Sequence, residues 1–243
     1  MDQDINMSME DFNFSQRIYR RSELPIADHL MSYQSALRDE FMAEYNNLEQ
    51  AVNAIPSSLG HRDEIPQEIV DYFVQSKVDG KYMPSVTSWL NKGLKYHNTK
   101  DNDLVKFPTA LKLIQEYGDD CPIANYSMLG PHSVINRHTG IENRSGEYIR
   151  IHIPLIVPAG DIFFEVYGEE IDWSDIFGFN NQLPHSAWNN TDEWRLCFLI
   201  DIHRARAGLP PGLPYDKDLE INAEPFVRNG TQLGIKPDTS WFK

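Results

Sequence analysis

The stretch between residues 127 and 203 decides the fold. It opens with Ser127-Met-Leu-Gly-Pro-His-Ser-Val-Ile-Asn-Arg-His138-Thr-Gly140, continues with Tyr148-Ile-Arg150-Ile-His152-Ile-Pro-Leu155, and closes with Leu183-Pro-His185-Ser-Ala-Trp188 and Trp194-Arg195-Leu-Cys-Phe-Leu-Ile200. The second segment alternates apolar and polar side chains, as a half-buried β-strand does. The last segment extends to Ile202 and is apolar on nearly both faces, which predicts a strand at 194–202 buried between two layers. Residues 162–167, Ile-Phe-Phe-Glu-Val-Tyr, predict a further strand. Short strands separated by Gly, Pro and Asn predict a jelly roll or a related barrel.

Helical patterns flank this stretch on its N-terminal side. Apolar residues recur at helical spacing between residues 28 and 48, and a short helix is expected at 66–76. Residues 107–117 predict another helix, which Gly118 ends. Residues 83–98 predict an edge strand followed by a loop. We therefore expect an N-terminal helical support segment at 1–84, a β core at 85–204 and an extended tail packed on the core at 205–243, anchored by Trp241 and Phe242.

Composition excludes several classes of partner. The 243 residues carry a formal net charge of −14, and the sequence pI is about 4.9. A nucleic-acid-binding protein would need a clustered basic face, and so would a protein that docks on anionic lipid. No apolar run approaches the roughly 20 residues of a membrane span, and the polar, acidic N-terminus is not a secretory signal. These features predict a cytoplasmic protein without nucleic-acid or membrane partners.

The two cysteines, Cys121 and Cys197, do not form a CxxC pattern, so a thiolate metal cluster is excluded. Cys197 lies in the apolar strand and is interpreted as a small core residue. The sequence leaves open whether the two cysteines form a disulfide.

Four histidines lie within 54 residues, at positions 132, 138, 152 and 185. His138 and His185 both stand beside turn-forming residues, which predicts loops at strand ends, where a barrel presents side chains to its mouth. Neutral imidazole is the commonest metal ligand, and together with oxygen ligands it suits Fe(II). Spacing alone still favours the simpler interpretation, that these are surface histidines or hydrogen-bonded core histidines.

The arginines strengthen the case for a site. Arg195 follows His185 by ten residues and starts an otherwise apolar strand. A buried guanidinium needs an anionic partner, because an unpaired buried charge is very costly. Arg150 and His152 share one strand face, so a small dicarboxylate could bind there through charge-assisted hydrogen bonds. The alternative is an internal ion pair, for instance of Arg150 with Asp201 or Glu165.

Residues 85–204 resemble the aspartyl/asparaginyl β-hydroxylase family, a branch of the 2-oxoglutarate-dependent oxygenases. Five elements carry the resemblance in order. They are Lys106-Phe-Pro108, a serine eleven residues before His138-Thr-Gly140, the Arg150-x-His152 pair, the second histidine His185, and an arginine ten residues after it.

The resemblance implies a mainly β fold with flanking α-helices, built on a double-stranded β-helix (jelly-roll, cupin-like) core with the N-terminal helices packed against it. It implies Fe(II) bound by His138 and His185, and 2-oxoglutarate paired with Arg195 and contacted by Ser127, Arg150 and His152, with O2 as the oxidant. His138, His185 and Arg195 are accordingly the catalytic candidates. Most of the superfamily places an acid two residues after the first histidine; Gly140 stands there, as in the β-hydroxylases, and water is expected to fill that position.

Family members that act on peptidyl aspartate carry a basic residue two positions before this Arg-x-His arginine. Here that residue is Tyr148, which is the candidate substrate contact. The expected reaction is hydroxylation of an unactivated carbon of an amino acid or peptide side chain, with succinate and CO2 as coproducts. The sequence leaves open the alternative that the target carbon belongs to a lipid-like acyl group. The rivals are a non-catalytic jelly-roll binding module that has lost iron, and a zinc hydrolase, which would need a third protein ligand and a placed glutamate base.

Overall fold

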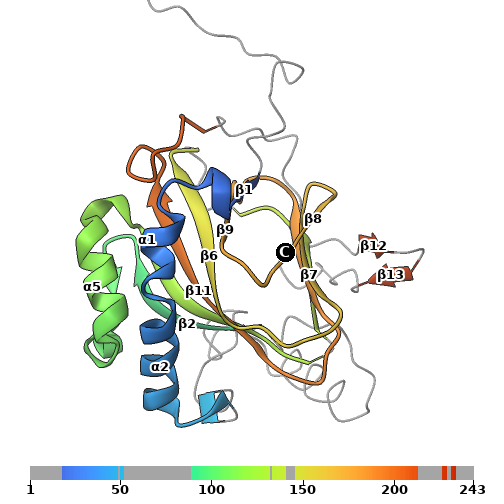
Figure 1. The fold of residues 1–243 in the computed structure, drawn as a ribbon, viewed down its shortest axis with the longest axis horizontal. Coiled ribbons are helices and arrows are strands. Elements are labelled where there is room, and N and C mark those ends of the chain that lie inside the picture. The colour runs from blue at the N-terminus through green and yellow to red at the C-terminus, as the bar shows by residue number, and fades with distance from the viewer. Residues whose placement is uncertain are drawn as a thin grey trace, which may run out of the picture.

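The structure is a computed structural model that describes residues 18–48, 50–51, 89–131, 133–140, 146–212, 226–228 and 231–233. The core of the described chain consists of two antiparallel sheets that face each other, with helices outside one of them (Figure 1). This is the expected double-stranded β-helix core with flanking helices. Within the described ranges, no helix combines the length and the apolar character that crossing a bilayer requires.

The larger sheet has seven strands. Their order across the sheet is β1 (Ile18–Arg20), β9 (Phe177–Phe179), β6 (Tyr148–Ile156), β11 (Arg195–His203), β4 (Ile123–Leu129), β2 (Trp89–Tyr96) and β3 (Thr99–Lys100). The predicted strands β6 and β11 are confirmed to within one residue at each end, and they pair along nearly their whole length at the centre of the sheet. Strand β1, which periodicity did not predict, adds the N-terminal segment to the edge of this sheet.

The smaller sheet has four strands in the order β5 (Ser133–His138), β10 (His185–Asn189), β7 (Ile162–Val166) and β8 (Glu169–Ile171). Strand β7 was predicted from its composition. Strands β5 and β10 were not, because each is short and begins or ends beside Gly or Pro. A separate hairpin pairs β12 (Phe226–Arg228) with β13 (Thr231–Leu233) in the C-terminal segment.

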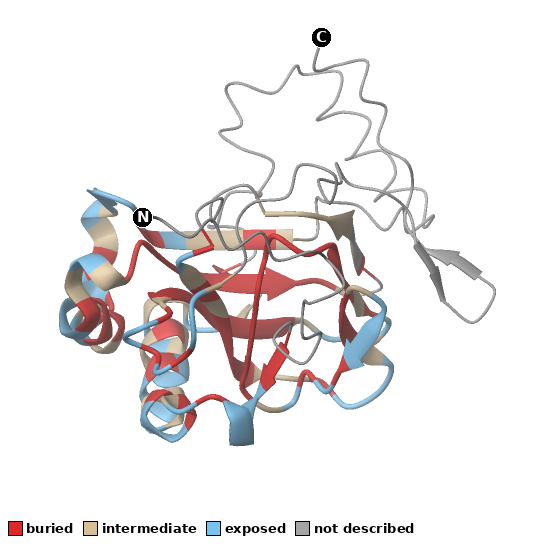
Figure 2. Ribbon diagram, turned by 90° about the horizontal axis from the view of Figure 1, so that it is seen from above, coloured by how far each residue is buried: buried red, intermediate tan, exposed pale blue. Residues whose placement is uncertain are grey.

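Two apolar cores use the two faces of the larger sheet. Ile149, Ile151 and Ile153 of β6 pack in the core beneath the helices, whereas Phe177 and Phe179 of β9 belong to the core between the sheets. This confirms the alternation predicted for β6, and it directs the even-numbered Arg150 and His152 into the space between the sheets. Figure 2 shows the strands largely buried and the helices exposed on their outer sides.

The helices cover the larger sheet. They are the 3-10 helix η2 (Arg21–Glu23), α1 (Ala27–Met31), α2 (Gln34–Tyr45), the 3-10 helix η5 (Asn102–Lys106), α5 (Pro108–Tyr117) and the 3-10 helix η6 (Gly118–Asp120). Helix α5 matches the prediction, and Gly118 ends it with a φ of 56°. The single helix expected at 28–48 is instead two, because Ser32 bonds the carbonyl of His29 and turns the chain. The helix expected at 66–76 and the anchor Trp241–Phe242 lie outside the described residues.

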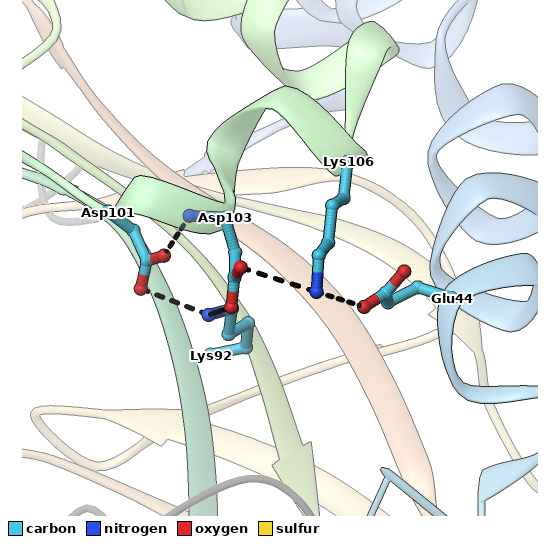
Figure 3. Close-up of polar contacts among 5 residues, drawn as sticks. All are labelled: Glu44, Lys92, Asp101, Asp103 and Lys106. Atoms are coloured by element: carbon cyan, nitrogen blue, oxygen red, sulfur yellow. Dashed lines mark hydrogen bonds and ion pairs between the residues drawn. The ribbon is translucent and has the colours of Figure 1, made fainter.

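Ion pairs join the helical cover to the sheet (Figure 3). Lys106 at the end of η5 lies 2.9 Å from Glu44 on α2 and 3.2 Å from Asp103. Lys92 of β2 contacts Asp101 at 3.0 Å and Asp103 at 3.3 Å. The family-like segment at residues 106–108 therefore supports the fold, away from the space between the sheets.

Candidate metal and anion site

The two candidate metal ligands are brought together. His138 is the last residue of β5 and His185 is the first residue of β10, and they are direct cross-strand partners. Their ring centroids are 4.2 Å apart. The sequence predicted loops for both residues. Their position at paired strand ends is more rigid, because the ladder fixes one backbone against the other.

His185 is oriented as a metal ligand would be. It is buried, and its Nδ1 lies 2.8 Å from the carbonyl oxygen of Leu183. A carbonyl only accepts, so Nδ1 carries the proton and Nε2 keeps its lone pair. Burial, and then the neighbouring His138, hold the pKa of His185 well below its usual value, so the ring is neutral. Neutral imidazole is the form that binds metal.

The described residues form no closed protein cage for a metal. In the part of the chain that the structure describes, no group of three or more His, Cys, Asp or Glu side chains could hold an ion. Gly140, two residues after His138, offers no side-chain ligand, and its backbone N–H donates to the carbonyl of Asn181 at 2.7 Å. Two imidazoles therefore fit a metal whose remaining ligands are oxygens of bound molecules, which suits Fe(II) better than structural zinc.

Arg195 supplies a buried positive charge. Its side chain is fully buried, and its guanidinium carbon lies 3.4 Å from the centroid of the Trp173 ring. Its Nε and Nη2 have no hydrogen-bond partner among the residues described. Burial lowers the pKa of Arg195 to about 10, so it is still charged at neutral pH. Such N–H groups require an acceptor, and an anionic ligand would provide one.

His152 adds a donor beside the arginine. Trp173 Nε1–H donates to His152 Nδ1 over 3.4 Å, which leaves the proton of the neutral ring on Nε2. That nitrogen has no partner in the described ranges. Burial, and then Arg195, hold the pKa of His152 well below its usual value. The ring packs among Phe164, Phe177 and Phe179, which keep this space apolar.

Ser127 lies on β4 opposite Cys197 of β11, two residues along that strand from Arg195. Its Oγ accepts a hydrogen bond from Trp89 Nε1 at 2.9 Å. A side-chain hydrogen bond also links this hydroxyl to Cys197, so both groups bonded to Ser127 Oγ belong to the protein. Both cysteines are free and buried, and the disulfide that the sequence left open does not form.

Arg150 follows the alternative that the sequence left open. Its Nε and Nη2 bind the two carboxylate oxygens of Asp201 at 2.8 and 2.9 Å. The pair forms between directly opposed residues of β6 and β11. Since Asp201 is buried and uses the bidentate edge of the guanidinium, the geometry favours a structural role for Arg150 over a direct contact with a ligand.

Tyr148 stands apart from the histidines. It is four residues from His152 along β6, which corresponds to about 13 Å of strand. Its ring packs edge-on against His203, with centroids 5.5 Å apart. Two tryptophans were missed at the sequence level. Trp173 and Trp89 contact site residues, but each lies where no periodic pattern marks it.

Comparison with known proteins identifies the family. A family model described as aspartyl/asparaginyl beta-hydroxylase matches residues 34–205, which is more than half of the chain. No curated protein matches it. Among solved structures, a 2OG-Fe(II) oxygenase family oxidoreductase from Burkholderia pseudomallei is 10% identical, covers 53% of this chain and 71% of its own, and has a TM-score of 0.37.

Two further likenesses are to cupin-type proteins. A predicted oxalate decarboxylase from Thermotoga maritima is 16% identical and covers 37% of this chain and 73% of its own, with a TM-score of 0.29. A cupin domain of a transcriptional regulator from Enterobacter cloacae is 13% identical and covers 48% of this chain and 97% of its own, with a TM-score of 0.31. TM-scores this low support no argument about function. The family match is what identifies the chain, and it belongs to the aspartyl/asparaginyl β-hydroxylase family.

Proposed function

We propose that the protein is an Fe(II)- and 2-oxoglutarate-dependent dioxygenase that hydroxylates an unactivated carbon of an amino acid or peptide side chain. Substrate–H, 2-oxoglutarate and O2 would give substrate–OH, succinate and CO2. A cytoplasmic location, with neither nucleic acid nor membrane as partner, is part of the proposal. Two observations support it: the cross-strand histidine pair, and a buried guanidinium whose Nε and Nη2 have no partner in the described chain. Aromatic side chains link the two, because Phe164 and Phe179 contact both His185 and His152, and Trp173 contacts both His152 and Arg195.

The protein's own groups divide the work. His138 and His185 would hold Fe(II), which, when bound, supplies the redox chemistry that couples O2 reduction to oxidation of the keto acid and the substrate. Arg195 would pair with the distal carboxylate of 2-oxoglutarate, His152 would donate to the same molecule, and Ser127 would contact it. The phenylalanines around His152 exclude water from this space.

The substrate would approach at the ends of β5 and β10, where the histidine pair lies. Tyr148 remains a proposed substrate contact. Its distance of about 13 Å from His152 along the strand suits an extended substrate such as a peptide better than a small amino acid.

Spectroscopy and product analysis test the proposal together. Anaerobic addition of Fe(II) and 2-oxoglutarate to the full chain is expected to produce a weak visible charge-transfer band, and admission of O2 is expected to yield succinate. His138→Ala should abolish both signals, because one imidazole cannot hold the metal in this geometry. His29→Ala is the matched control, since His29 pairs with Glu116 on the helical side. Absence of both signals in the wild type would instead favour a non-catalytic binding module.

A further inference from the structure

Trp173 contacts both donor groups of the anion site at once. One face of its indole lies against the guanidinium of Arg195, 3.4 Å from ring centroid to guanidinium carbon. Its Nε1–H reaches His152 Nδ1 at 3.4 Å. Only 2% of the residue is exposed, so neither contact competes with bulk water.

Trp173 lies on a turn between β8 and β9 that hydrogen bonds restrain on both sides. The carboxylate of Asp172 accepts from the N–H of Ser174 at 2.8 Å, and Asp175 accepts from the N–H of Ile176 at 2.8 Å. Asp175 also lies 3.5 Å from Arg21 of η2. These bonds restrain the backbone on both sides of the indole, so the side chain has a fixed base.

Each contact leaves a donor free for a ligand. Stacking uses the flat face of the guanidinium, so the N–H groups around its edge stay available, and Nε and Nη2 are the ones without a partner in the described chain. The bond to Nδ1 places the imidazole proton on Nε2, which is also without a partner there. Three N–H groups therefore share one supporting side chain, and only a ligand with several acceptor oxygens would satisfy them.

We propose that Trp173 is a positioning residue that presents Arg195 and His152 to the carboxylate groups of 2-oxoglutarate and so sets the preference for a dicarboxylic keto acid. This rests on the proposed function. The competing interpretation is that Trp173 only fills space between the sheets, in which case its loss would lower stability and would weaken all ligands equally.

The test compares two keto acids that share the same reacting end. 2-Oxobutyrate lacks the distal carboxylate of 2-oxoglutarate, so the ratio of their dissociation constants reports on the carboxylate contact alone. Both are titrated calorimetrically into the full chain loaded with Mn(II), which replaces Fe(II) and prevents turnover. The wild type is expected to bind 2-oxoglutarate more tightly than 2-oxobutyrate.

Two substitutions separate the roles of the indole. Trp173→Leu removes both contacts, and the ratio is expected to fall by about 10- to 30-fold, as for loss of a desolvated cation–π contact. Trp173→Phe keeps a weaker stacking ring without the N–H, and the ratio is expected to fall by about threefold. Trp188→Phe is the control, because Trp188 bonds Asp161 on the outer side of the smaller sheet; it should keep the wild-type ratio.

The outcomes separate the two proposals. A wild type that binds neither keto acid overturns the proposed function and this inference with it. A wild type that prefers 2-oxoglutarate, with both Trp173 variants within twofold of its ratio, overturns the inference alone. If Trp173→Leu shows no cooperative unfolding transition, Trp173→Phe decides, and a ratio equal to that of Trp188→Phe counts against the role.

Discussion

Arg195 is the residue at which stability and function oppose each other. A buried cation with two N–H groups that have no partner in the described chain destabilises the ligand-free protein, since contacts with Trp173 and Cys197 offset its desolvation only in part. A fold without need of a ligand gains nothing from such a group. The proposed anion beside this side chain would account for its presence.

Replacing Arg195 by Met is expected to stabilise the ligand-free protein. Met keeps an apolar contact with Trp173 and removes the unmet donors, so unfolding in urea should cost roughly 1–2 kcal/mol more, while 2-oxoglutarate binding is lost. Arg204→Met is the matched control. Arg204 is also buried, but it donates to Pro210 O and Tyr19 Oη, each at 2.7 Å, and its loss should destabilise by roughly 1–3 kcal/mol. Equal destabilisation by both substitutions would argue against a ligand role for Arg195.

For a single residue, the sequence predicts the charge of the side chain and the strand face on which it lies better than it predicts the partner of that side chain. Arg195 could be predicted because an apolar strand rarely carries a guanidinium unless an anion pairs with it. Arg150 could not be assigned, because strand alternation gives its face, while its partner Asp201 depends on the β6–β11 register, which no local pattern encodes. Trp173 was missed because it lies on a turn between strands of three residues.

Among the elements, α5 depends on a residue from another helix. No side chain caps it at Phe107. Instead, Glu40 of α2 accepts from the N–H groups of Thr109 and Ala110 at 2.6 and 2.9 Å and from the hydroxyl of Tyr126 at 2.7 Å. This carboxylate joins α2, α5 and β4 at one point.

Glu40→Ala should destabilise the protein by about 2–3 kcal/mol, because the first turn of α5 loses its acceptor and the buried Tyr126 hydroxyl loses a partner. Urea unfolding measures the effect. Glu44→Ala, one turn along α2, removes a surface contact with Lys106 and should change the midpoint little. A similar loss from both variants would show that general helix charge, and not the cap, is responsible.

Long elements were predictable and short ones were not. The nine-residue strand β6 and helix α5 show clear periodicity, the nine-residue strand β11 is a continuous apolar run, and the structure matches all three. Strands β5, β9 and β10 have three to six residues, too few for a period to appear. The candidate ligands His138 and His185 lie in two of these short strands, so the sequence could nominate them and could not show that they are cross-strand partners.

For the whole molecule, packing predicts how stability varies with pH. Burial raises the pKa of Cys121 to about 12 and, with smaller effects of nearby acids, the pKa values of Tyr45 and Tyr117 to about 12. In the unfolded chain these groups ionise near pH 9–10. The folded protein keeps these groups neutral, so ionisation above about pH 9 favours the unfolded chain. What the three groups contribute to the free energy of unfolding is therefore complete below about pH 9 and is lost as the pH rises toward 12.

The urea midpoint should accordingly fall between pH 8 and pH 10.5. The Tyr117→Phe variant has no ionisable group at this position, so its urea midpoint should fall less steeply with pH than that of the wild type. A wild-type midpoint that stays constant across this range would contradict the assignment of these groups to the packed interior.

His138, His185 and Arg195 are proposed to form one site for a metal ion and a keto acid. The most direct measurement is an anomalous difference map from crystals soaked anaerobically with Mn(II) and 2-oxoglutarate. We predict one manganese peak bonded to both imidazoles, with density for the keto acid reaching from the metal to the guanidinium of Arg195. Manganese bound away from the histidine pair, or a keto acid that leaves Arg195 without a partner, would contradict it.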